Sequence, residues 1–187
     1  MDYRGQTLLP AGLQNNNPGD IRTGDSWLGM AGSSNGFVVF IDSVYGLRAL
    51  AVDLTNVYEN DGLTTVTEIV THYAPPSEND TASYIENVAA SMGVDADVDI
   101  NLSADPSVLP ALMRAIIDQE LGGQYSAMVS DNDIQQGILL IPATSVGTDA
   151  SAASPSPSSS DSSGAAIPLF VIGIAVVAAI VFGSRNN

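Results

Sequence analysis

The side chain in this sequence with the clearest chemical potential is Glu120. In the segment 110–121 apolar residues recur at helical spacing, and Glu120 follows Ile116 by four positions, which places its carboxyl at the end of the buried stripe. It also falls in the last helical turn, where the helix dipole disfavours an anion. Both effects raise the pKa of a carboxyl, as a general acid near neutrality requires. The competing interpretation is a helix-end glutamate that turns out to solvent.

A second group of residues has the chemistry of a sugar-binding cleft. Amides, carboxylates and aromatic rings line such clefts, because a pyranose presents hydroxyls at its edge and C–H groups on its face. The candidates, on predicted loops and helix starts, are Asn16, Asn17, Asp20, Arg22, Asp25, Trp27 and Tyr84. The alternative is that each Asn or Asp only completes its own turn.

Two other motifs resemble a metal site or a catalytic site, but neither predicts a metal or a cofactor. The acidic run 95–101 resembles the start of a calcium loop, but Ile100 replaces the required Gly and Pro106 the required Glu, so a solvated acidic turn is preferred. His72 is the single histidine, and without a nucleophile motif it is expected to be a packing or surface residue.

Composition excludes several classes of function. The 187 residues contain 21 acidic residues against five basic ones, all arginine, for a net charge of −16. Nucleic acid is therefore not an expected partner, because phosphate binding needs Lys and Arg. Cysteine is absent, so disulfides, thiolate metal sites and cysteine nucleophiles are excluded. The first residues carry no apolar stretch, and no cleavable signal peptide is expected.

The C-terminal quarter of the sequence predicts a tether and an anchor. Segment 165–182 is apolar and uncharged, and at ~1.5 Å per residue it is long enough to cross a bilayer core of about 30 Å with little mismatch. The alternative is a buried core helix. Segment 144–164 is rich in Ser, Ala, Pro and Asp, which is typical of a disordered linker. The prediction is a domain over 1–143, this linker, a transmembrane anchor over 165–183 and a polar tail over 184–187.

The elements that must position the candidate residues are mainly helical. The strongest strand pattern is 37–41, followed by a helix capped by Asp42 or Ser43 and running to Tyr58. Further helices are predicted from a capping box at 65–68, from 79 or 80 to Gly93, from 105 to 121, and over 134–141. The predicted fold class is mainly α, an α+β domain with a small lobe of strand and loop, and a single C-terminal transmembrane helix.

Several segments together carry a family resemblance. They are Asn-Asn-Asn-Pro-Gly-Asp-Ile-Arg at 15–22, Trp-Leu-Gly at 27–29, Phe-Val-Val-Phe at 37–40, Tyr-Gly-Leu-Arg-Ala at 45–49, the run 73–81 with Tyr84, and Ala-Ile-Ile-Asp-Gln-Glu at 115–120. This set resembles a family of bacteriophage virion proteins associated with lysozyme-like domains. The order of segments 16–22, 37–43 and 73–84 is also similar to that of flagellar-type β-N-acetylglucosaminidases, with the glutamate helix moved to the end as in a circular permutation.

The resemblance implies a domain that cleaves the glycan strands of peptidoglycan as a muramidase, glucosaminidase or lytic transglycosylase. Glu120 would protonate the glycosidic oxygen, while Tyr84 and the 16–22 loop would position the sugar and stabilise oxocarbenium charge. A permuted arrangement requires Glu120 to lie close to that loop and to Tyr84 across one cleft.

A second catalytic carboxylate is the remaining part of the expected site. Inverting and retaining hydrolases need one, and the candidates are Asp25, Asp42 and Glu78, of which Glu78 is taken as the second catalytic residue. A lytic transglycosylase needs none, because the substrate's own hydroxyl attacks.

The expected partners are peptidoglycan, a lipid membrane, and the capsid or other virion proteins. The expected location is a virion membrane or host cell membrane, with a single-pass C-terminal anchor. The alternative function is a non-catalytic virion structural membrane protein that keeps the same fold, favoured by Leu121, which stands where the similar enzymes have Ser. A third possibility is a host-encoded surface adhesin.

Overall fold

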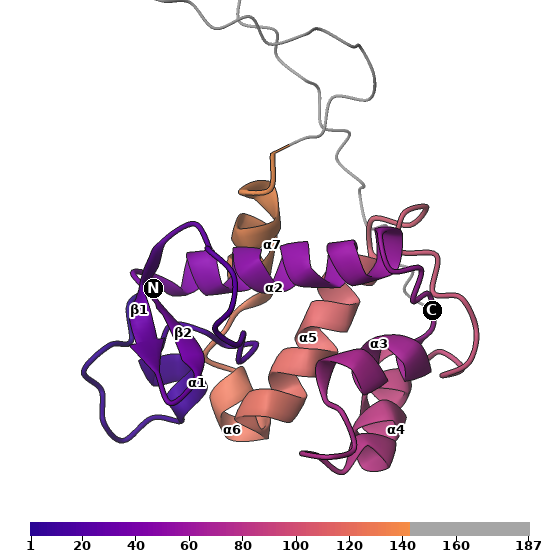
Figure 1. Cartoon of the computed structure of the whole chain (residues 1–187), viewed down its shortest axis with the longest axis horizontal. Helices are drawn as coiled ribbons and strands as arrows, with labels where there is room; N and C mark the ends of the chain where they lie inside the picture. Colours follow the sequence, from indigo (N-terminus) through magenta and orange to yellow (C-terminus); the bar gives the residue numbers. More distant parts are fainter. Residues whose placement is uncertain (143–187) are drawn as a thin grey trace, which may run out of the picture. The chain divides into compact units, whose positions relative to one another are not determined.

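Helix α5 (Val108–Leu121) is the central element of the computed structural model, which describes residues 1–142. Figure 1 shows the other helices arranged around it. Its packing partners are α1 (Ala11–Gln14), α2 (Ser43–Glu59), α4 (Thr81–Met92), α6 (Gly123–Ser126) and α7 (Asp131–Leu139). Helix α3 (Val66–Tyr73) joins through α2 and α4. The apolar stripe of α5, including Leu112, Ile116 and Ile117, is fully buried.

The caps that set the helix starts agree with the sequence. The Asp42 side chain accepts a hydrogen bond from Val44 N at the start of α2, and Thr65 and Glu68 form the predicted capping box of α3. The Asp80 side chain caps α4, which ends at Gly93 in the left-handed conformation with φ of 69°. These local signals confirm the predicted starts of α2, α3 and α4.

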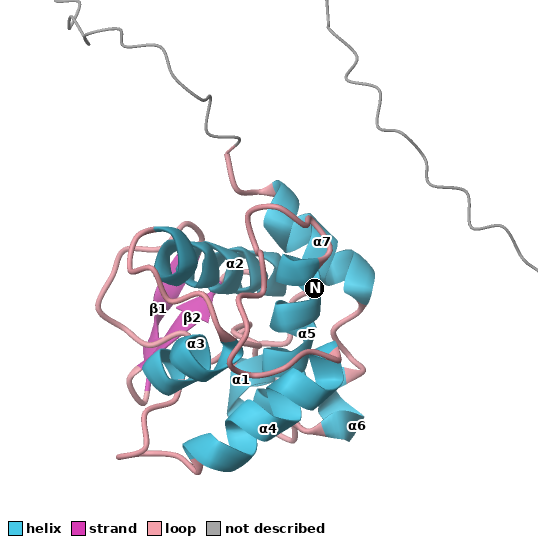
Figure 2. Cartoon of the chain, turned by 90° about the vertical axis from the view of Figure 1, so that its right-hand side faces the viewer, coloured by secondary structure: helices cyan, strands magenta, loops and turns pink. Residues whose placement is uncertain are grey.

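A two-stranded antiparallel sheet packs beside α2 (Figure 2). Strand β2 (Phe37–Phe40) matches the predicted strand, and its partner β1 (Met30–Ser34) was not predicted, because its glycine and serines read as a loop. Asn35 and Gly36 connect them, both with positive φ, as a tight hairpin turn requires. Val38 and Phe40 are fully buried and join the sheet to the core.

Two helix starts differ from the sequence prediction, and two short helices were not predicted. Helix α5 begins at Val108 rather than near 105, because the Asp105 side chain accepts from Ser107 N in a preceding turn. Helix α7 begins earlier than predicted, at a Ser130–Asp133 capping box. The short helices α1 and α6 lack an amphipathic pattern of useful length and were not predicted.

The predicted fold class and localisation require a correction. Among residues 1–142, no helix has both the length and the apolarity needed to cross a membrane. The longest, α2, has 17 residues and carries Arg48 and Asp53. The described structure is a mixed fold of helices with one two-stranded sheet, without the C-terminal transmembrane helix or single-pass anchor that the sequence suggested. The segments 144–164 and 165–183, predicted as linker and anchor, lie outside the described residues.

Candidate active site

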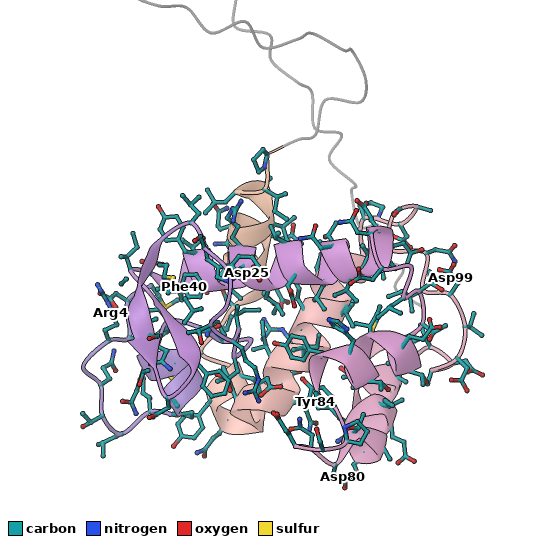
Figure 3. The ribbon with its side chains drawn as sticks, in the orientation of Figure 1. Arg4, Asp25, Phe40, Asp80, Tyr84 and Asp99 are labelled. Atoms are coloured by element: carbon teal, nitrogen blue, oxygen red, sulfur yellow. The ribbon has the colours of Figure 1, made fainter. Side chains whose placement is uncertain are left out.

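Glu120 and Tyr84 form the first contact of the site. The Tyr84 hydroxyl donates a hydrogen bond of 2.7 Å to Glu120 Oε1, and links α4 to the last turn of α5. Tyr84 is labelled in Figure 3, and its side chain is only 4% exposed. Beside it, Asn87 Nδ2 donates to Gln119 Oε1 at 3.1 Å. The two helices thus hold the Glu120 carboxyl in a fixed place.

Asp20 reaches the same carboxyl from the turn after α1. Its backbone has a positive φ of 47°, which an aspartate tolerates better than most residues and which directs its side chain toward α5. The Asp20 and Glu120 carboxyls lie close enough to form a hydrogen bond to each other. Two carboxyl groups can do so only while one of them holds a proton.

Burial and proximity explain the titration of this pair. Burial raises the pKa of Asp20 to about 7, and the charge of Glu120 and the shared hydrogen bond add to the effect. Burial also raises the pKa of Glu120, while its hydrogen bonds from Tyr84 and Asp20 oppose that rise. The charge of Arg22 lowers both pKa values. Asp20 therefore keeps a proton up to about pH 7 beside a second carboxyl, an arrangement that is suited to give and take a proton.

The pair faces a cleft of about 330 Å³. Asp20 and Glu120 lie on its wall together with two more acidic residues, Asp25 and Asp53, and with the aromatic residues Trp27, Phe37 and Tyr73. Figure 3 shows Asp25 in front of helix α2, which carries Asp53. An acidic cleft with aromatic walls matches the polar edges and apolar faces of a sugar chain.

Arg22 and Glu78 form an ion pair beside the cleft. Arg22 Nη2 lies 2.5 Å from Glu78 Oε2, and both side chains are more than half exposed. The guanidinium carbon of Arg22 also lies 5.2 Å from the centre of the Phe37 ring. Arg22 lines the cleft, whereas Glu78 is not one of its lining residues. The structure thus places Glu78 as the partner of Arg22, separate from the carboxyl pair.

The structure corrects the expectation that Asn16 and Asn17 face a sugar. Both side chains are 0% exposed, so a ligand cannot reach them. Asn17 Nδ2 donates to the carbonyls of Ile21 and Val38, and its Oδ1 accepts from Ile21 N at 2.9 Å. Asn16 Oδ1 accepts from Tyr3 N at 2.7 Å. These amides shape the turn that presents Asp20.

The other predicted residues separate into two groups. Glu120, Tyr84, Arg22 and Trp27 come together, which confirms the expected closeness of Glu120 to the 16–22 loop and to Tyr84. Their catalytic and binding roles stay predictions. Asp42 lies elsewhere, capping α2 and accepting from the Met1 amino group at 2.7 Å, so it is not available as the second carboxylate.

Sequence reasoning missed the pairing of Asp20 with Glu120 and the contribution of α3. The Tyr73 hydroxyl donates to the Gly19 carbonyl and so holds the residue next to Asp20. His72 lines the cleft and its charge lowers the pKa of Asp53. The one available signal for Asp20 was its position at the end of a turn-rich run, where an exposed backbone can present a carboxylate.

Comparison with known proteins relates the chain to a bacteriophage protein. No protein-family model matches the chain. The chain is 34% identical over 117 residues to Protein P5 of Pseudoalteromonas phage PM2, an alignment that covers 59% of this chain and 71% of that protein. The match supports the expected bacteriophage virion protein and says nothing of a lysozyme-like relationship. The chain belongs to the family of Protein P5 of phage PM2.

Proposed function

We propose that this protein is a virion-associated bacteriophage enzyme that cleaves the glycan strands of peptidoglycan. The observation that carries the proposal is the Asp20–Glu120 pair, two neighbouring carboxyls with raised pKa values at the wall of an acidic, aromatic cleft. The family relationship to a phage protein supports the setting, because a phage must pass the host wall.

The closeness of the two carboxyls favours one reaction type. Retaining and inverting glycosidases keep their two carboxyls roughly 5–9.5 Å apart, to leave room for the sugar or a water. Two carboxyls close enough to hydrogen-bond to each other, as Asp20 and Glu120 are, leave no such room. The pair is better suited to act as one acid–base unit, with a hydroxyl of the substrate as the nucleophile.

The steps balance with these groups alone. The protonated carboxyl of the pair gives its proton to the glycosidic oxygen as the bond from that oxygen to the anomeric carbon breaks. The sugar's own 6-hydroxyl then attacks the anomeric carbon and passes its proton back to the pair. The products are a shortened strand and an internal anhydro sugar. Tyr84 holds Glu120 in position throughout.

The test uses the full chain, purified cell walls and the variant Glu120→Gln. The substitution keeps the shape of the side chain and removes its proton chemistry, so turbidity loss should fall by about 10²–10⁴-fold. Glu86→Gln, on the exposed face of α4, is the matched control and should clear walls like the wild type. Equal activity of Glu120→Gln and wild type would end the assignment.

A non-catalytic structural role in the virion is the second candidate. It is favoured by the fact that Tyr84 and Asp20 satisfy the Glu120 carboxyl from within the protein. In that case the network stabilises the fold, and the partners are other virion proteins. Wild-type protein that leaves walls uncleaved, with Glu120→Gln markedly less stable, would select this candidate.

A further inference from the structure

Gly12 is a glycine in a place where the backbone does not require one. It is buried in helix α1, and its φ lies outside the left-handed region that favours glycine. Inside a helix alanine is intrinsically more favourable than glycine, because glycine loses more backbone entropy on folding. A helical glycine of this kind therefore indicates a neighbour that leaves no room for a side chain.

The neighbours of Gly12 belong to the two elements that carry the carboxyl pair. A Cβ atom on Gly12 would lie 2.9 Å from Asp20 Oδ1 and 3.0 Å from Cδ2 of Leu121, the residue after Glu120. It would also lie 3.2 Å from the carbonyl oxygen of Asn17. All three distances are shorter than ordinary van der Waals contact, and Leu121 is itself buried in the core. A methyl group at this position would therefore push the Asp20 carboxyl and the end of α5 apart.

The turn that carries Asp20 is held on several sides and cannot simply shift as a whole. The Asp20 N–H donates to the Asn17 carbonyl at 3.0 Å, and Asn17 N donates to the Gly12 carbonyl at 2.8 Å. The Gly19 carbonyl accepts from the Tyr73 hydroxyl of α3. Because the backbone of the turn is bound to both α1 and α3, crowding at Gly12 must be relieved by the Asp20 side chain.

We infer that Gly12 is a positioning residue, whose missing side chain provides the space in which the Asp20 carboxyl lies beside Glu120. The inference deepens the proposed function and rests on it only for the effect on cleavage. A methyl group at position 12 displaces the Asp20 carboxyl from Glu120 and from the buried end of the cleft, and the two carboxyls then act on each other less.

Gly12→Ala isolates geometry from charge. Helix α1 contains no titratable side chain, so the substitution adds and removes no charge near Asp20. The titratable groups that face Asp20 come from other segments and stay in place: Glu120 of α5, Arg22, Tyr73 of α3 and Tyr84 of α4. A changed titration of Asp20 in this variant can therefore come only from a changed position.

The test follows the Asp20 titration by carboxyl-carbon NMR of the full chain, with the signal assigned by its loss in Asp20→Asn. The wild-type midpoint should lie near the pKa of about 7. In Gly12→Ala it should fall by about one pH unit or more toward 3.8, because exposure and distance from Glu120 both favour the ionised form. An unchanged midpoint overturns the inference.

Gly137→Ala is the matched control for crowding in general. Gly137 is a buried glycine of α7 whose Cβ would lie 2.6 Å from Leu47 Cβ rather than beside Asp20. This variant should be less stable to urea than the wild type and should keep the wild-type midpoint of Asp20. A midpoint that falls equally in Gly137→Ala would show a general effect of crowding and would also overturn the inference.

Removal of the Asp20 carboxyl tests the same contact from the other side, including the case in which Gly12→Ala does not fold. Asp20→Gly takes away the closest contact, and glycine tolerates the φ of 47° at that position. Gly12→Ala should then cost less stability in the Asp20→Gly background than in the wild type, by urea unfolding at pH 5. An equal or larger cost, or failure of both Gly12→Ala variants to fold, contradicts the role of Gly12.

Wall clearance gives a separate reading of the catalytic consequence. Below its unfolding temperature Gly12→Ala should lose about 10²-fold, the effect of a displacement of ~1 Å at a reacting group. Gly137→Ala should stay within severalfold of wild type. Clearance by Gly12→Ala at the wild-type rate would overturn the positioning role. Wild-type protein that leaves walls uncleaved contradicts the proposed function alone, and the Asp20 titration still decides whether Gly12 positions that carboxyl.

Discussion

The carboxyl groups of Asp20 and Glu120 lie close enough to shift each other's pKa, although they come from the turn after α1 and the last turn of α5. The contact exists because Asn17 and Tyr73 fix the turn on one side and Tyr84 fixes the glutamate on the other. The stability of the fold and the proposed chemistry therefore depend on the same pair, and each can be tested by substitution.

The pair should make the protein less stable as pH rises toward neutrality. The folded pKa of Asp20, about 7, lies above its ordinary value of 3.8, so the folded state retains the proton more strongly than the unfolded chain. Stability from this group is therefore full below about pH 4 and is lost as pH rises through 7. Urea unfolding at pH 5 and pH 8 measures the loss. Asp20→Asn should flatten the difference, and an unchanged pH dependence in that variant would contradict the account.

Tyr84→Phe should lower activity and shift its pH dependence. The hydroxyl hydrogen bond favours the ionised Glu120, so its removal raises the pKa of that carboxyl further. We expect about a tenfold loss of wall clearance, in line with a charged hydrogen bond, and an upward shift of the acidic limb of the pH–rate profile. Tyr58→Phe, which removes an exposed hydrogen bond to Asp99, is the matched control. An unshifted profile would show that Tyr84 only packs.

Glu78→Gln distinguishes a catalytic glutamate from the partner of Arg22. If Glu78 only pairs with Arg22, its loss costs little, because exposed ion pairs contribute about 0–1 kcal/mol. Wall clearance should stay within severalfold of wild type, against the large loss in Glu120→Gln. A loss as large as that of Glu120→Gln would restore Glu78 as the second catalytic residue.

Asn17→Ala should destabilise the domain rather than weaken sugar binding directly. The change removes the Asn17 partner of the buried Ile21 N–H and of the Val38 carbonyl, at about 1–3 kcal/mol for each group left unsatisfied, whereas the Ile21 carbonyl still accepts from Val38 N. Urea unfolding should show a loss of several kcal/mol, and Asn132→Ala, on the exposed side of α7, should show almost none. Near wild-type stability of Asn17→Ala would contradict this role.

Local signals explain which parts of the fold were predictable. The caps at Asp42, Thr65 and Asp80 act within a few residues, and the structure keeps them. Strand β1 escaped prediction, because its glycine and serines gain strand geometry only by pairing with β2. The expected anchor at 165–183 lies outside the described residues, and no sequence pattern within residues 1–142 tests it.

The site was predictable only in part for a similar reason. Helical spacing predicted that Glu120 lies at the end of a buried stripe. The family resemblance predicted that Tyr84 and the 16–22 loop lie close to Glu120. The direction in which an asparagine side chain points depends on the hydrogen bonds of the folded structure. The Asn16 and Asn17 side chains are buried and hydrogen-bond to backbone groups. The pairing of Asp20 with Glu120 depends on a positive φ that sequence alone does not specify for an aspartate.

Mass spectrometry of the fragments released from purified walls identifies the reaction that Asp20 and Glu120 carry out. We expect strands that end in an internal anhydro sugar, because the close Asp20–Glu120 pair leaves the substrate's own hydroxyl as the nucleophile. Those fragments should be lost in Glu120→Gln and retained in Glu86→Gln. Fragments with ordinary reducing ends, or no fragments from wild-type protein, would contradict it.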